Sequence, residues 1–255
     1  MLHVGIDLHG TLITDHPEQV PPQALPRLLT AMDALGRRAR LYVCTGNDLG
    51  FLRRKLPPEV MKRLDGAVLE TGCVASDLAA ETVLVAPEVL AAVKALEQDL
   101  RGCRFPWVYK FARRLATISM FTQLGLRAAD FRDTVEREVS RLGGAQLVQV
   151  TYSSVAVDVI PRGFNKLTGL RRLAGDQPVV GIADSMNDLE LVRGADYAFL
   201  PANCARELLS SLERSGKPVQ EIGEASGLRP HVAILCTESF TDAVSQALTF
   251  LAREL

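Results

Sequence analysis

Near its start the chain reads Val4-Gly5-Ile6-Asp7-Leu8-His9-Gly10-Thr11-Leu12, an apolar run that delivers one aspartate and then breaks at a glycine. The run is too short for a helix, and Gly10 after the polar pair indicates a sharp turn, so we interpret it as a buried strand. Asp7 would then lie at the carboxyl end of a strand, where open α/β sheets bind their ligands. On this segment alone, an aspartate that only caps the turn is an equally good interpretation, because short motifs match by chance.

The composition limits the classes of partner. The chain has 255 residues, enough for one large or two moderate domains. Lys and Arg number 29 and Asp and Glu number 30, which gives a net charge of -1. Nothing therefore indicates a basic surface for nucleic acid or for an anionic membrane, and we expect a small-molecule partner.

The cysteines and the hydropathy pattern indicate a compartment. The five cysteines are widely spaced and include no Cys-x-x-Cys pair, so neither a disulfide framework nor a structural zinc site is predicted. The sequence shows no secretory signal pattern and no apolar run of membrane-spanning length. We expect a cytoplasmic protein, and its oligomeric state stays open between a monomer and a homodimer.

Strand and helix patterns alternate in the first and last parts of the chain. After the opening strand, the sequence predicts strands over 40–44, 66–72, 178–183, 197–200 and 231–235, and helices over 25–35, up to 56, 165–173, up to 192, 205–212 and 240–251. This one-to-one alternation favours a parallel sheet covered by helices.

The middle of the chain has a different pattern. It predicts a hairpin around 83–85, helices over 87–101 and 130–142, a strand over 117–121 and a strand pair from 148 to 160. Because strands and helices do not alternate one to one here, we predict an inserted α+β domain. The predicted organisation is an α/β core formed by 1–72 and 161–255, with the inserted domain at 73–160.

Three predicted core strands end in a polar residue: Asp7, Thr45 and Asp184, with Asp188 one helical turn further on. In a parallel sheet these ends share one rim. Carboxylates that converge there are costly unless a cation neutralises them, and an all-oxygen site of few ligands suits Mg²⁺ together with a phosphate. The Thr45 hydroxyl with its adjacent backbone N–H groups, and the positive charge of Lys166, would suit a phosphoryl oxygen.

Four segments resemble, in order, the four motifs of the haloacid dehalogenase-like (HAD) phosphohydrolases. They are Asp7-Leu8-His9-Gly10-Thr11-Leu12, Thr45-Gly46-Asn47, Asn165-Lys166 and Asp184-Ser185-Met186-Asn187-Asp188. The insertion resembles the type-2 (C2B) cap of that superfamily. The resemblance covers essentially the whole chain and implies a Rossmann-like parallel-sheet HAD core with an inserted α+β cap.

Within the superfamily, three segments look most like the branch that contains archaeal-type phosphoglycolate phosphatase and sucrose-phosphate phosphatase. These segments are Thr45-Gly46-Asn47, Asp158-Val159-Ile160-Pro161-Arg162-Gly163 and Pro201-Ala202-Asn203. The branch resemblance favours a small phosphorylated metabolite, a sugar or a small acid such as phosphoglycolate, as the substrate.

The resemblance also implies roles for the motif residues. Asp7 would be the nucleophile that forms an aspartyl-phosphate, and Thr45 and Lys166 would bind the transferring phosphoryl group. The implied Mg²⁺ ligands and the residues that orient them are Asp7, the backbone carbonyl of His9, Asp184, Asp188 and Asn187.

Further residues are candidates for substrate binding. Gly46 and Asn47 follow Thr45 in the second motif, and Ser154 and Arg162 lie near the return from the insertion to the core. A basic cluster of Lys110, Arg113 and Arg114 would bind a substrate carboxylate or a second anionic group, although such clusters are more often solvated surface. A cap of this kind would exclude water from the phosphoryl site when it closes.

Two positions depart from the family pattern. His9 replaces the aspartate that normally protonates the leaving oxygen and then activates water, and Ala183 replaces a glycine before Asp184. Imidazole titrates at about pH 6.5, so His9 is able to act as general acid or base near neutral pH, with a different reach from a carboxylate.

The sequence therefore predicts a Mg²⁺-dependent phosphatase that hydrolyses a small phosphomonoester. Two alternatives stay open. The His9 replacement would be compatible with a catalytically weak or inactive protein that binds a phosphorylated ligand. Phosphoryl transfer between sugar positions would share the first half-reaction but keep the phosphate on the substrate.

Overall fold

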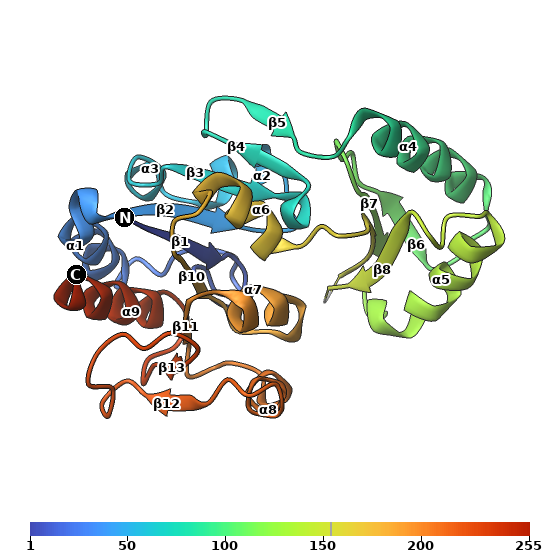
Figure 1. Ribbon diagram of the computed structural model, residues 1–255. Helices are drawn as coiled ribbons and strands as arrows, with labels where there is room; N and C mark the ends of the chain where they lie inside the picture. Colours follow the sequence, from blue (N-terminus) through green and yellow to red (C-terminus); the bar gives the residue numbers. More distant parts are fainter. Residues whose placement is uncertain (154) are drawn as a thin grey trace. The chain divides into compact units, whose positions relative to one another are not determined.

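The computed structural model describes residues 1–153 and 155–255. They form two compact units, Met1–Glu81 with Asn165–Leu255, and Thr82–Phe164, which we call the core unit and the inserted unit (Figure 1). Among the described residues, no helix combines the length and the apolar character needed to cross a membrane.

The core unit is built on one sheet with the strand order β12-β13-β11-β10-β1-β2-β3-β4-β5. Neighbouring strands are parallel from β12 to β3, whereas β4 is antiparallel to β3. The strands are β1 Leu2–Asp7, β2 Ala39–Cys44, β3 Gly66–Leu69, β4 Val74–Ser76, β5 Glu81–Val83, β10 Val179–Ile182, β11 Tyr197–Leu200, β12 Val219–Glu221 and β13 Ala233–Leu235. The mainly parallel α/β fold class predicted from the sequence is confirmed.

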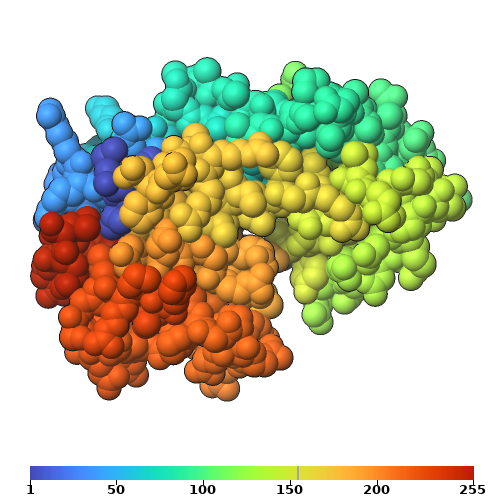
Figure 2. All heavy atoms as spheres, viewed as in Figure 1, coloured from blue at the N-terminus to red at the C-terminus, as the bar shows by residue number. Residues whose placement is uncertain are grey.

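Helices cover this sheet. They are α1 Leu25–Leu35, α2 Leu49–Lys55, α3 Pro58–Met61, α6 Lys166–Ala174, α7 Leu189–Gly194, α8 Arg206–Arg214 and α9 Phe240–Glu254, with short 3₁₀ turns η1 Gly36–Arg38, η2 Glu70–Gly72 and η4 Met186–Asp188. Alternate residues of β2, Tyr42 and Cys44, pack with α6, α7 and α8 in one apolar cluster. Helices α1 and α9 pack against each other (Figure 1), and α7 and α8 lie side by side in the space-filling view (Figure 2).

Strand β1 occupies the interior of the sheet, and all its residues are buried. It pairs in parallel with β10 on one side and β2 on the other, with Ile6 opposite Ile182 and Asp7 opposite Cys44. A strand buried on both faces and both edges reads as a continuous apolar run, which is the pattern at the start of the sequence. Its carboxyl end therefore meets those of β2 and β10 at one edge of the sheet.

The inserted unit has its own sheet and core. Its strands β6 Val108–Phe111, β7 Ile118–Thr122, β8 Val148–Tyr152 and β9 Ala156–Pro161 are ordered β6-β7-β9-β8 and all pair antiparallel. Helices α4 Pro87–Gly102 and α5 Arg132–Arg141, with the 3₁₀ turn η3 Ala128–Phe131, complete it. Alternate strand residues pack with both helices around Trp107, so one face of this sheet is apolar.

The boundaries between the units differ from the predicted 72/73 and 160/161. Strand β4 pairs with β3 and so extends the core sheet beyond residue 72, and the chain enters the inserted unit through β5. The short elements β6, β12 and α3 were not predicted from the sequence. Such three- and four-residue elements carry too little periodicity to be recognised.

Helix α6 approaches the sheet closely because of Gly169. A Cβ built at this position would lie 2.6 Å from Val68 Cγ1 and 2.8 Å from the Cα of Gly72. Only a residue without a side chain allows α6 to pack this tightly against β3 and η2. This approach sets the position of Lys166, the first residue of the helix.

We expect Gly169→Ala to lower the free energy of unfolding by about 1–3 kcal/mol, because overpacking outweighs the gain in helix propensity. The matched control is Gly102→Ala at the end of α4, where a Cβ would meet no atom within 4 Å. It should leave stability unchanged or raise it by up to about 1 kcal/mol. Urea denaturation followed by circular dichroism measures both. Equal stabilities for the two variants would contradict the close-packing argument.

Candidate active site

Lys166 connects two buried carboxylates at the rim of the core sheet. Its Nζ lies 2.6 Å from Asp7 Oδ1 and 2.6 Å from Asp188 Oδ1. Asp7 ends β1, Asp188 lies in the turn η4 after β10, and Lys166 begins α6. The Lys166 side chain is 10% exposed, so this double ion pair is largely shielded from water.

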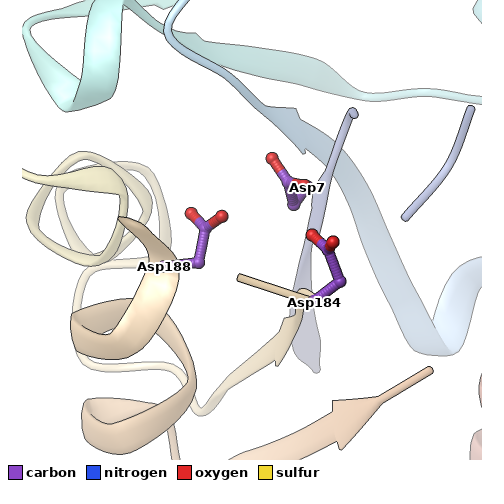
Figure 3. Close-up of side chains that lie close together, drawn as sticks. All are labelled: Asp7, Asp184 and Asp188. Atoms are coloured by element: carbon purple, nitrogen blue, oxygen red, sulfur yellow. The ribbon is translucent and has the colours of Figure 1, made fainter. Parts of the chain in front are cut away.

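Asp184 completes the acidic cluster. One carboxylate oxygen from each of Asp7, Asp184 and Asp188 lies within 4.8 Å of the others, and the three side chains point toward one another (Figure 3). The Thr11 hydroxyl contacts Asp7 Oδ2 at 3.1 Å and Asp184 Oδ1 at 3.2 Å, and so links the first and fourth motifs. Gly10 turns the chain here with a φ of 73°, and any Cβ at Gly10 would collide with the Asp184 carboxylate.

The cluster perturbs the titration of its members. Burial, then the Asp7 and Asp188 carboxylates, raise the pKa of Asp184 to about 8. Burial and the Asp7 carboxylate raise the pKa of Asp188 to about 6, although Lys166 opposes the shift. Burial by itself would lower the pKa of Lys166, but the Asp188 and Asp7 carboxylates outweigh it and raise this pKa, so the ammonium stays charged.

The donor set fits a hard divalent cation. Three carboxylates share a space that one ammonium does not fully neutralise, as the raised pKa values of Asp184 and Asp188 indicate. Mg²⁺ prefers oxygen ligands and is commonly held by one or two carboxylates with a substrate phosphate. The predicted ligand Asn187 is exposed on η4, whereas Asp7 and Asp188 are buried.

The loop after β2 is fixed by its backbone. Cys44, the last residue of β2, pairs with Asp7 on β1, and Thr45 is the next residue of the chain after Cys44. Thr45 N–H donates to Val68 O at 2.8 Å, and its carbonyl accepts from Thr71 N–H at 3.0 Å. Its Oγ1 accepts from Asn47 N–H at 3.2 Å. The predicted phosphate-binding residues Thr45, Gly46 and Asn47 therefore lie in an ordered turn at the rim that carries Asp7.

His9 is engaged by a neighbouring carboxylate. Its Nε2 lies 3.4 Å from Glu18 Oε1, and the other Glu18 oxygen lies 2.6 Å from Lys55 Nζ. The imidazole also packs at a tilt against the ring of Phe51, with 5.5 Å between centroids. Burial lowers the pKa of His9, and the Glu18 and Asp15 carboxylates partly oppose this. At neutral pH the imidazole is therefore mainly uncharged.

The other predicted substrate-binding residues belong to the inserted unit. Lys110 on β6 places its Nζ 5.0 Å from the centre of the Phe121 ring, and Arg114 Nε donates to Ser119 Oγ at 3.4 Å. Arg162 Nε donates to Ala145 O at 2.9 Å. Ser154 lies outside the described residues.

Three residues at this rim were not predicted from the sequence: Thr11, Glu18 beside His9, and Asn203, whose Nδ2 donates to Gly10 O at 2.8 Å. Thr11 lies inside the first motif, four residues after Asp7, and its hydroxyl was a signal that could have been used. Asn203 lies in a segment noted only for its family resemblance. Glu18 lies in a polar loop, and no local pattern distinguishes it from its neighbours.

Solved structures, but not family models or curated sequences, show which known fold this chain shares. No family model matches the sequence, and no curated protein matches it significantly. Solved structures do match. A Thermoplasma acidophilum protein is 13% identical, with a TM-score of 0.69 over 100% of this chain and 99% of that one.

Two matching structures are phosphatases by name. The sucrose-phosphatase of Synechocystis, solved with sucrose and phosphate, is 20% identical, with a TM-score of 0.62 over 97% of this chain and 96% of that one. A phosphatase of the HAD superfamily from Bacteroides thetaiotaomicron is 15% identical, with a TM-score of 0.65 over 98% and 95%. The chain therefore has the fold of the HAD-superfamily phosphatases, over its whole length.

Proposed function

We propose that this protein is a Mg²⁺-dependent phosphatase that hydrolyses a small phosphomonoester through an aspartyl-phosphate on Asp7. The observation that carries the proposal is the arrangement of Asp7, which is held 2.6 Å from the Lys166 ammonium at a rim shared with Asp184 and Asp188. A structural aspartate that caps a turn needs neither a buried lysine nor two further carboxylates beside it.

The reaction would proceed in two steps. A carboxylate oxygen of Asp7 attacks phosphorus, the bond from phosphorus to the ester oxygen breaks, and the leaving alcohol takes up a proton. Water then attacks phosphorus, loses a proton, and releases inorganic phosphate with the Asp7 carboxylate restored. Covalent catalysis of this kind divides one difficult displacement into two easier ones.

Charge stabilisation would supply most of the acceleration, as phosphoryl transfer generally requires. The Lys166 ammonium stays charged and lies beside Asp7, so it would stabilise negative charge on the phosphoryl oxygens as they approach. The hydroxyl of Thr45 and the backbone N–H groups around Gly46 would donate to the same oxygens. The Thr11 hydroxyl would fix the positions of the Asp7 and Asp184 carboxylates relative to each other.

When bound, Mg²⁺ would supply a second positive charge that neutralises the phosphoryl oxygens and the cluster of carboxylates. Asp7, the His9 carbonyl and Asp184 would hold it. Asp188, which contacts both Lys166 and Ser185, would orient these groups.

His9 would move the proton in both steps. One of its nitrogens faces Glu18, which leaves the other for the leaving oxygen or the attacking water. In the first step the protonated form of His9 would give its proton to the leaving oxygen, and in the second step the resulting neutral imidazole would take a proton from the attacking water, which restores the protonated form.

The substrate class is proposed from the fold relatives and from the branch resemblance. The relative solved with sucrose and phosphate supports a phosphorylated sugar, and a small acid such as phosphoglycolate is the other candidate. The contact between His9 and Glu18 favours a second candidate function. In it the protein binds a phosphorylated ligand but hydrolyses it slowly or not at all, because His9 is held by Glu18.

Asp7→Asn should lower kcat for phosphate release by roughly 10⁴-fold or more, because the nucleophile is lost. The measurement is phosphate release from a panel of phosphorylated sugars and acids, with Mg²⁺ and with a chelator. Asp176→Asn, an exposed aspartate of the same unit, is the matched control and should keep wild-type activity.

The panel also separates the alternatives. Metal-dependent release that is absent in Asp7→Asn supports the phosphatase. Release from His9→Asp but not from the wild type would favour the binding protein, and phosphate that moves to another position on the sugar would favour phosphoryl transfer.

The pH profile tests His9. If the second step limits kcat, we expect kcat of the wild type to fall as the imidazole base becomes protonated, at a pH below the ordinary imidazole value of about 6.5, because burial lowers the pKa of His9. Because the Glu18 carboxylate raises the pKa of His9, Glu18→Gln should move this limb to lower pH. His9→Ala should remove the limb and lower kcat at pH 7 by about 10²-fold or more. Glu59→Gln, an exposed residue of α3, is the control, and a limb that persists unchanged in His9→Ala would exclude the acid/base role.

A further inference from the structure

Asn203 joins two segments that are far apart in the sequence, and the proposed reaction does not use it. Its Nδ2 donates to Gly10 O at 2.8 Å, and its Oδ1 accepts from Phe240 N–H at 2.9 Å. Both polar ends of the amide are therefore occupied. One partner lies in the 7–12 turn that carries Asp7, and the other is the first residue of α9.

A second bond joins the same two segments. The buried Thr241 hydroxyl donates to Leu12 O at 2.7 Å. The 7–12 turn also closes on itself, since Leu12 N–H donates to Asp7 O at 3.2 Å. The turn is thus held at Gly10 and Leu12 from outside, on either side of Thr11, whose hydroxyl reaches both Asp7 and Asp184.

The backbone of Phe240 is strained where it meets Asn203. Its φ is 51°, in the left-handed region that a bulky side chain rarely adopts. Strain of this kind costs about 1–3 kcal/mol and persists only where the surroundings impose it. Here the strained residue directs its N–H at Asn203, and Asn203 in turn holds the carbonyl of Gly10.

We propose that Asn203 is a positioning residue for the metal site, with Thr241 in a supporting role. It holds the Gly10 carbonyl and so fixes the Gly10–Thr11 peptide. The orientation of this peptide sets that of the adjoining His9 carbonyl and of the Thr11 hydroxyl between Asp7 and Asp184. This inference rests on the proposed function, in which the His9 carbonyl and these carboxylates hold Mg²⁺. Residues that orient metal ligands in this way typically contribute 10–100-fold in metal affinity.

Gly10 explains why the turn needs an external anchor. Gly10 has a positive φ, and glycine loses more backbone freedom on folding than any other residue. The 7–12 turn therefore has little intrinsic preference for the conformation that it has in the structure. Close contact with the Asp184 carboxylate forbids any other residue there. The rigidity that a side chain at this position cannot provide comes from Asn203 instead.

The test is calorimetric titration of the metal-free protein with Mg²⁺ alone, beside the Mg²⁺ dependence of phosphate release. Asn203→Ala should weaken Mg²⁺ binding by about tenfold or more, and Thr241→Val should weaken it by less. The matched control is Ser245→Ala, which removes the buried 2.8 Å hydrogen bond from Ser245 Oγ to Thr241 O one turn further along α9. It should lower the melting temperature without changing Mg²⁺ affinity.

The outcomes separate this inference from the proposed function. Unchanged Mg²⁺ affinity in Asn203→Ala, or an equal loss in Ser245→Ala, would overturn the positioning role even if the wild type is an active phosphatase. A selective loss of affinity in Asn203→Ala and Thr241→Val supports it even if the wild type releases no phosphate. If Asn203→Ala does not fold, Thr241→Val decides by the same comparison. A wild-type protein that binds no Mg²⁺ would overturn the inference outright.

Discussion

The contact on which the site depends is the pair of 2.6 Å ion pairs that Lys166 makes with Asp7 and Asp188. Bringing carboxylates together in a buried place is unfavourable, and a buried charge is tolerated only when an opposite charge and hydrogen bonds compensate it. Lys166 gives part of that compensation, and its position follows from the close packing of α6 on β3 at Gly169. The Lys166 ammonium is therefore positioned by a residue that has no side chain.

The rim is assembled from elements that are widely separated in the chain. β1 provides Asp7, the loop after β10 provides Asp184, and the first turn of α6 provides Lys166. Parallel pairing brings their ends to one edge, and short polar contacts then fix their relative positions. Thr11 bridges two of the carboxylates. Asn203, in the loop after β11, and Thr241, in α9, hold the 7–12 turn at Gly10 and at Leu12.

The inserted unit has a core of its own, in which α4 and α5 pack on one face of an antiparallel sheet. Its polar residues satisfy one another locally: Ser119 Oγ donates to Asp158 Oδ1 at 2.5 Å and also accepts from Arg114 Nε. In HAD phosphatases a unit at this place in the chain is the cap, which the resemblance associates with substrate choice. The packing of this unit explains its fold but does not select a ligand. The proposed substrate class is therefore drawn from the branch resemblance and from the structures that share the fold.

The sequence by itself determined the parallel core, the insertion and the motif residues Asp7, Thr45, Lys166, Asp184 and Asp188, because strand periodicity and glycine-terminated turns are local signals. The resemblance to the HAD motifs also indicated that His9 departs from that pattern. Only the tertiary structure decided that Thr11, Glu18 and Asn203 belong to this rim, that Asn187 is exposed, and that β4 extends the core sheet. Those facts depend on contacts between residues up to 193 positions apart, as between Gly10 and Asn203, and no local pattern encodes such a contact.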